Sequence, residues 1–216
     1  MTTKTTTVIV LVLIGLAALA GAAQWNQFPE QMASHWNIND EADGYMTKFW
    51  GVFLTPLVTL GMLALFLALP NMDPLKANVA QFRESFNLFI VLIAAFMLYV
   101  HGLTLAWNLG YRDFKMSAAT LPFLGVLFIA VGWMLRKAKR NFFIGIRTPW
   151  TLSSDAVWEK THRLGSSLFM ASGLLAIAGG FFGGAAAFWL TFAPLIGSSL
   201  FLVIYSYALY RGETEA

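Results

Sequence analysis

"FNLFIVLIAAFMLYVHGLTLAWN", residues 86–108, runs from end to end without one Asp, Glu, Lys or Arg. A helix that crosses the hydrocarbon core of a bilayer needs roughly 17 to 25 mostly apolar residues. This stretch therefore predicts a transmembrane helix, and we find five more of the same kind. The six predicted spans are Thr7–Ala23, Trp50–Leu69, Phe86–Asn108, Ala118–Leu135, Ser167–Phe182 and Phe188–Tyr210. We expect an all-α, polytopic membrane protein.

Composition supports this class. Of the 216 residues, 58% are hydrophobic and 12% charged, whereas soluble domains average roughly a quarter charged. The longest segments between spans, 24–49 and 136–166, are shorter than the roughly 40 residues that usually fold alone. We expect two regions: 1–69, a helix pair with its outer loop, and 70–216, a four-helix region containing the loop 136–166. The chain has no cysteine, which excludes disulfides, iron–sulfur clusters and cysteine-rich zinc sites.

The charges predict the orientation. With the N-terminus inside, eleven Lys and Arg side chains fall on cytoplasmic segments, and the outer segments hold only Lys48, Arg112 and Lys115. Cytoplasmic loops carry the excess of Lys and Arg, so both termini are predicted to be cytoplasmic. Residues 4–22 also have the features of a cleavable signal sequence, and the sequence leaves open whether the first helix is retained.

Three histidines are the candidates for metal or acid–base chemistry. By topology His35 falls outside, His101 within the membrane and His162 inside, so they cannot share one site. An intramembrane ionisable residue is a functional candidate. Near the outer interface, however, His101 also suits a neutral, hydrogen-bonded role, and the sequence leaves both interpretations open.

The polar segment 145–165 contains Ser, Asp, His and Arg, which suggests a hydrolase site. In a helix Asp155 and His162 lie about 10 Å apart along the axis, too far for the contact that a catalytic triad needs. A structural role explains the polar start better: Ser153 or Ser154 caps a helix, Asp155 complements its positive end, and Glu159 pairs with Arg163. We predict no catalytic residue, no metal and no cofactor.

With a hydrolase site excluded, the polar segment and the residues just before it are predicted to form a basic, aromatic surface. A short amphipathic helix at the cytoplasmic headgroup level would form an interfacial elbow between the fourth and fifth spans, and "RKAKR", residues 136–140, would anchor it to anionic lipid. A docking surface for a partner protein is the alternative. Further along, small residues spaced four apart predict close packing of the last two helices; they are Ala176, Gly180 and Gly184, with Gly179 and Gly183.

Two segments of the chain resemble known protein families. "NFFIGIRTPWTLSSDAVWEKTHRLG", residues 141–165, resembles the signature of the bacterial SdpI family of toxin-immunity membrane proteins. "FPEQMASHWNINDEADGYMTKFWG", residues 28–51, is similar to the small uncharacterised domain that often precedes that signature. The two segments and their helices span essentially the whole chain. Two positions depart from the pattern: an acidic residue is expected at Ala156 and a glycine at Ser166.

The resemblance implies sites on both faces of the membrane. On the cytoplasmic face it implies partner binding by Asn141, Gly145, Arg147, Thr148, Pro149, Trp150, Asp155, Trp158, Lys160, His162 and Arg163. On the outer face it implies a binding role for Pro29, His35, Asn37, Gly44 and Lys48.

The resemblance also implies a function: immunity to a membrane-active peptide toxin at the outer face, with capture of a transcriptional repressor at the inner face. It implies a multi-pass protein of the bacterial cytoplasmic membrane that binds lipid and has no direct contact with nucleic acid. Two other functions stay open. One is a small-solute transporter using His101, and the other is a structural partner of a neighbouring membrane protein. The toxin, the partner and the oligomeric state are not readable from the sequence.

Overall fold

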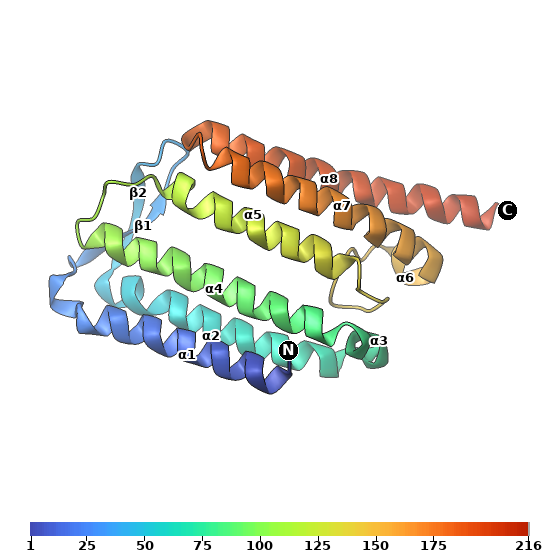
Figure 1. Ribbon diagram of the computed structural model, residues 1–216, viewed down its shortest axis with the longest axis horizontal. Helices are drawn as coiled ribbons and strands as arrows, with labels where there is room; N and C mark the ends of the chain where they lie inside the picture. The colour runs from blue at the N-terminus through green and yellow to red at the C-terminus, as the bar shows by residue number, and fades with distance from the viewer. Residues whose placement is uncertain (216) are drawn as a thin grey trace.

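The computed structural model describes residues 1–215 as two groups of long helices lying side by side (Figure 1). In the first group α1, α2 and α4 pack together, and in the second α5 and α8 pack around α7. Helix α4 meets α5 and joins the groups. The six long helices are α1 (Thr3–Ala23), α2 (Lys48–Met72), α4 (Arg83–Asn108), α5 (Met116–Leu135), α7 (Asp155–Gly179) and α8 (Gly184–Thr214). The short elements are η1 (Trp25–Gln27), β1 (Gln31–Trp36), β2 (Ala42–Thr47), α3 (Lys76–Gln81) and α6 (Pro149–Ser153).

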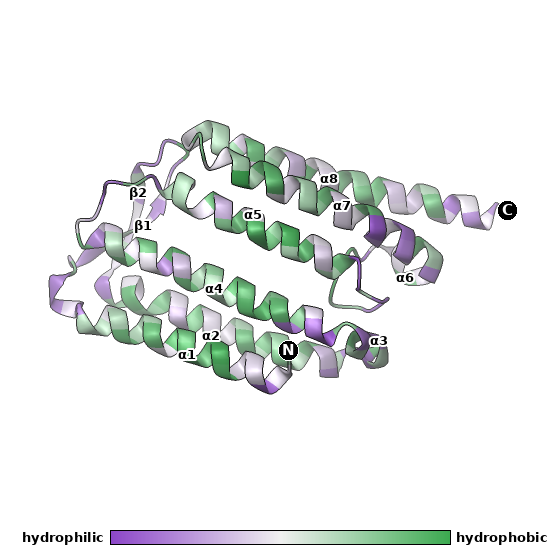
Figure 2. Cartoon of the chain, in the orientation of Figure 1, coloured by the Kyte–Doolittle hydropathy of each residue, from purple (hydrophilic) through white to green (hydrophobic). Residues whose placement is uncertain are grey.

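The predicted class, an all-α polytopic membrane protein, is confirmed. Within the described residues α1, α2, α4, α5 and α8 are long and apolar enough to cross a membrane. Hydrophobic residues follow the long helices, and hydrophilic residues gather toward their ends (Figure 2). Helix α7 falls outside this group of five because it begins with the polar residues 155–163. The predicted span Ser167–Phe182 largely coincides with the second half of α7, so a sixth crossing and the N-in, C-in orientation stay predictions.

The loop between α1 and α2, which we predicted to be the outer loop, contains a structure that we did not predict. Strands β1 and β2 pair antiparallel, with Met32 opposite Met46 and His35 opposite Gly44. The pairing is irregular between Ala33 and Trp36. The hairpin, which we define as residues 31–47, covers the ends of α2 and α4.

Small residues set the closest helix packing. A Cβ on Gly125 of α5 would lie 2.5 Å from the carbonyl oxygen of Gly173 on α7, and a Cβ on Gly173 would lie 2.5 Å from that of Gly125. This reciprocal contact brings two backbones together, as membrane helices do where small residues meet. The predicted packing of the last two helices is confirmed for Gly179, which faces the Ala187 backbone of α8, whereas Gly180 packs against Pro122 of α5 instead.

The other two glycines of that set do something else. Gly183 and Gly184 have φ angles of 69° and 55°, a region that glycine enters without steric cost. They therefore make the tight turn between α7 and α8 rather than a packing face.

Helix α1 is an integral part of the core. Its Val10 and Ile14 are buried in one cluster with Leu63 of α2 and Ile90 of α4. Burial of such a side chain from water stabilises a fold by about 1.5–3 kcal/mol. Inside a bilayer the stabilisation comes from close packing of the side chains instead.

Candidate functional site

The elbow, residues 136–154, links α5 to α7, and Asn141 builds its first turn. The Asn141 Nδ2 donates to the carbonyl oxygens of Lys139 and Ile144, both at 2.8 Å. Its Oδ1 accepts from the backbone N–H groups of Phe143 at 2.9 Å and Ile144 at 2.6 Å. Asn141 is fully buried, so one side chain satisfies backbone groups that could not otherwise reach water.

Two aromatic side chains of α7 form the floor of the elbow. The rings of Trp158 and His162 stack with centroids 3.9 Å apart. The Trp158 Nε1 donates to the Ala138 carbonyl oxygen at 2.9 Å. The two residues are one turn apart on α7 and lie at 3% and 2% exposure, which makes them internal supports rather than surface groups.

Hydrogen bonding fixes the tautomer of His162. Its Nε2 accepts from the Ile146 N–H at 3.0 Å, so Nδ1 carries the proton and donates to the Trp158 carbonyl oxygen at 2.9 Å. Burial lowers the pKa of His162 to about 4, although the bond to the Trp158 carbonyl acts in the raising direction. Because both ring nitrogens are engaged, this histidine is neutral and structural at neutral pH.

Gly145 lies directly against this pair. Its φ is 118°, and a Cβ there would overlap the His162 Nε2 and approach the Trp158 ring. Only glycine fits such a position at low cost. Gly145, Trp158 and His162 thus form one packed unit.

The short helix α6 is capped from within. Thr148 and Thr151 form a capping box with Pro149 in the first turn, an arrangement that satisfies the free N–H groups of a helix start. The Thr148 hydroxyl also lies 3.1 Å from that of Ser206 on α8. The Trp150 ring packs 5.0 Å from that of Tyr207, so α6 is held against α8.

Helix α7 begins as the sequence predicts. The Ser154 hydroxyl accepts from the Val157 N–H at 3.2 Å, and Asp155 occupies the first turn. The amphipathic helix predicted here is not a separate element, because residues 155–165 are the first turns of the long helix α7. The elbow itself is therefore the loop 136–148 together with α6.

The charged residues of the signature remain on the surface. Arg147, Asp155, Lys160 and Arg163 are exposed. Arg147 donates to the Phe142 carbonyl oxygen at 3.1 Å, and Asp155 pairs with Arg140, Nε to Oδ1, at 2.7 Å. The predicted Glu159–Arg163 pair is not among the ion pairs of the described residues.

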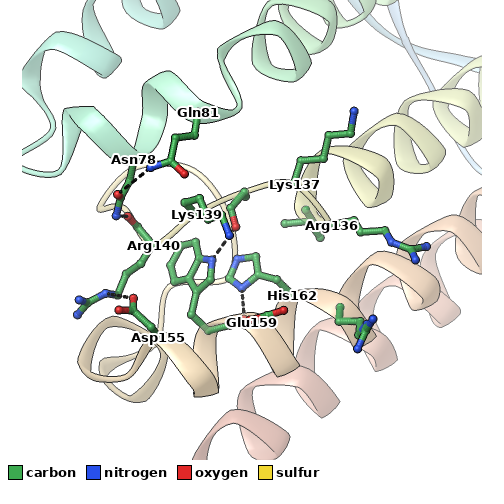
Figure 3. Close-up of a pocket in the computed structure, with 13 residues that line it drawn as sticks. Asn78, Gln81, Arg136, Lys137, Lys139, Arg140, Asp155, Glu159 and His162 are labelled. Atoms are coloured by element: carbon green, nitrogen blue, oxygen red, sulfur yellow. Dashed lines mark hydrogen bonds and ion pairs between the residues drawn. The ribbon is translucent and has the colours of Figure 1, made fainter.

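A cavity of about 680 Å³ opens between the elbow, α3 and α7 (Figure 3). Basic side chains dominate its rim, and Trp158 and His162 lie at its base. The rim cations are Arg136, Lys137, Lys139, Arg140 and Arg163, with Asp155 and Glu159 as the acidic members. We call this space the elbow cavity.

Sequence reasoning missed the residues that tie the elbow to the first helix group. The Asp73 carboxylate, 2% exposed, accepts from the Phe142 N–H at 2.9 Å and from the Leu75 N–H at 2.7 Å. Asn78 donates to the Arg140 carbonyl oxygen at 2.9 Å. Asp73 was the one local signal for this contact. It is an acidic residue in the proline-flanked turn after α2, and an acidic residue is seldom fully buried unless it has a partner.

Four of the five residues predicted for the outer face shape the hairpin. The Asn37 Oδ1 accepts from the N–H groups of Asn39 and Glu41 and so forms the turn. Lys48 pairs with Glu30 at 2.7 Å, and His35 Nδ1 lies 2.5 Å from Asp43 Oδ1. A Cβ on Gly44 would meet that of His35 at 2.8 Å. Pro29 is exposed just before β1.

Two further residues, also missed, fix the hairpin to the helices. Asn108 at the end of α4 accepts from the Ala33 N–H at 2.8 Å and donates to the Ala33 carbonyl at 2.9 Å. Asp40 accepts from the N–H and the hydroxyl of Ser117 at the start of α5. The hairpin is therefore held to both helix groups.

The remaining candidate, His101, lies apart from both places. It is 2% exposed within α4, and its Nε2 has no hydrogen-bond partner among residues 1–215. That part of the chain also contains no group of three His, Cys, Asp or Glu side chains placed to hold a metal.

The fold and the two polar ends define a polytopic membrane protein with a clamped outer hairpin and a hydrogen-bonded elbow at the opposite end of the bundle. Residues 137–206, which begin in the elbow, match the SdpI/YfhL protein family, and residues 12–60 match a domain of unknown function, DUF1648. The immunity protein SdpI of Bacillus subtilis (strain 168) is 28% identical over 178 residues, 82% of each chain. No solved structure matches. The predicted resemblance to the SdpI family is therefore confirmed.

Proposed function

We propose that this chain is a membrane immunity protein that protects the cell against a membrane-active peptide toxin. The observation that carries the proposal is the similarity to an immunity protein along 82% of both chains. We place the protein in the bacterial cytoplasmic membrane. It acts by binding rather than by catalysis, and both nitrogens of His162, one of the three histidine candidates, are engaged in hydrogen bonds.

We propose that toxin is met at the outer face. The hairpin exposes apolar side chains, with Ile38 at 41% and Tyr45 at 59%. A cavity of about 480 Å³ lies between its turn and α4, α5 and α8. Within the predicted outer set, His35, Asn37, Gly44 and Lys48 hold the hairpin in shape, and His35 and Pro29 are also exposed for contact.

At the inner face we propose docking of a regulatory protein. Arg147, Lys160 and Arg163 are exposed there. A surface of this charge suits an acidic or apolar patch of a transcriptional repressor and repels that protein's basic DNA-binding face. The buried members of the predicted set, such as Asn141 and His162, shape this surface, and the chain itself contacts no nucleic acid.

Expression in a toxin-sensitive bacterium tests the immunity proposal. Cells carrying the chain should survive a panel of membrane-active peptides at concentrations that kill cells carrying the empty vector. Membrane abundance of the tagged protein is measured in parallel. Equal killing by every peptide at normal abundance would contradict the proposal.

A further inference from the structure

Four cations on the rim of the elbow cavity have no anionic partner. Arg136, Lys137, Lys139 and Arg163 are exposed, and in the described part of the chain no carboxylate oxygen lies within 4.0 Å of their charged groups. The fifth cation, Arg140, is occupied by Asp155 and by the Leu152 carbonyl oxygen. Glu159 is thus the one rim carboxylate left to offset four positive charges.

Their positions make this more than a scattered basic surface. The cations come from two segments, the loop after α5 and one turn of α7, and they surround a single cavity of about 680 Å³ (Figure 3). The two α3 side chains that line the cavity are partly engaged, because Asn78 donates to the Arg140 carbonyl and Gln81 donates to Asn78. The charged hydrogen-bond donors of the cavity all belong to the cations.

The cavity lies at the end of a candidate membrane span, a position that suits a lipid headgroup. Its lining includes Leu135, the last residue of α5, and α5 is long and apolar enough to cross a membrane. Lys137 lies over the Trp133 ring at 3.9 Å, and Trp133 is 38% exposed. Tryptophan is enriched at the interface between membrane and water.

We propose that the elbow cavity binds a phosphate group, supplied by an anionic lipid headgroup or by free phosphate. Guanidinium forks bind phosphate oxygens in pairs, and lysines add point charges. The volume falls within the range of about 300–1,000 Å³ typical of small-ligand sites. The site is independent of the immunity proposal, and its test uses no toxin.

The test measures lipid retention by native mass spectrometry on the full chain purified in detergent. The probes are anionic phosphatidylglycerol, inorganic phosphate, and zwitterionic phosphatidylcholine, whose phosphate charge is balanced by its choline. The variant combines Arg136→Gln, Lys139→Gln and Arg163→Gln, all at exposed positions. The matched control is Lys76→Gln, an exposed cation on α3 that does not line the cavity.

We expect wild type and the control to retain phosphatidylglycerol above phosphatidylcholine, and the triple variant to lose at least about tenfold in affinity, because three of the four unpaired cations are removed. Competition by millimolar inorganic phosphate would assign the site to the phosphate group alone. Retention of phosphatidylglycerol without such competition would assign it to the whole lipid headgroup.

Three outcomes would overturn the proposal. One is equal retention of both lipids by wild type, and another is an equal loss in the Lys76→Gln control. The third is unchanged retention of phosphatidylglycerol by the triple variant. Circular dichroism of the triple variant checks that its helices are intact, and the single variants Lys139→Gln and Arg163→Gln repeat the measurement if they are not.

Discussion

At the scale of single residues, the signature divides into supports and surface. Asn141, Trp158 and His162 are buried and hydrogen-bonded, whereas Arg147 and Lys160 are exposed. The family resemblance placed all of them in one binding set, because a sequence motif does not reveal which way a side chain points. The structure gives the two groups different roles, and substitutions distinguish them.

Gly145→Ala should lower the free energy of unfolding by about 2–4 kcal/mol, because it forces alanine into a positive φ and into the His162 ring. Thermal unfolding in detergent measures the change. Gly197→Ala is the control, since a Cβ at Gly197 meets nothing within 4 Å. Equal melting temperatures for the two variants would show that the Gly145 contact is unimportant.

Protonation of His162 should destabilise the protein in acid. Its pKa is about 4 when folded and 6.5 when unfolded. The unfolded state therefore binds more protons between these values, and stability falls as the pH drops from 6.5 toward 4, by up to about 3 kcal/mol. Above pH 6.5 the stabilisation that neutral His162 gives the folded protein is fully present. Unfolding curves at several pH values should show a shallower acid slope for His162→Gln, and an unchanged slope would refute this role.

At the scale of elements, the long helices were predictable and their attachments were not. An apolar run such as 86–108 predicts α4 because length and hydropathy alone specify a membrane helix. The hairpin escaped prediction because Met32 and Ala33 are adjacent and both buried, which breaks the alternation that identifies a strand. The pairings of Asn108 with Ala33 and of Asp73 with Phe142 join residues 75 and 69 positions apart, and no local pattern reports them.

Substitution of Gly125 by a larger residue should separate α5 from α7. A leucine there cannot coexist with the Gly173 backbone, so we expect loss of most folded protein in Gly125→Leu, judged by membrane abundance and by gel filtration. Gly102→Leu on α4 is the matched control, because Gly102 faces open space. Comparable abundance of both variants would mean that the helices do not approach as described.

Asn108→Ala should loosen the hairpin without unfolding the bundle. It removes two hydrogen bonds to Ala33 and leaves buried backbone groups unpaired, a loss of about 1–3 kcal/mol. Faster protease cleavage within residues 31–47 of the purified protein would report this loosening. The control variant Asn39→Ala, at the exposed turn, should be cleaved at the wild-type rate. A protected hairpin in Asn108→Ala would contradict the clamp.

At the scale of the whole molecule, the bundle separates two polar ends, the hairpin and the elbow (Figure 2). The charge bias predicts that they lie on opposite sides of the membrane. The chain has no cysteine, so introduced cysteines report each side. We expect Asn39→Cys to react with an impermeant maleimide in intact cells and Lys160→Cys to react only after permeabilisation. The reverse pattern would invert the proposed orientation.

Survival under toxin tests whether immunity acts through the outer face. Once a peptide is found against which the wild-type chain protects, we expect Tyr45→Ala together with Ile38→Ser to abolish protection at normal membrane abundance. We expect Arg147→Ala together with Lys160→Ala to leave protection intact. Loss of survival in the variant of Arg147 and Lys160, with survival kept in the variant of Tyr45 and Ile38, would show that protection does not arise at the outer face.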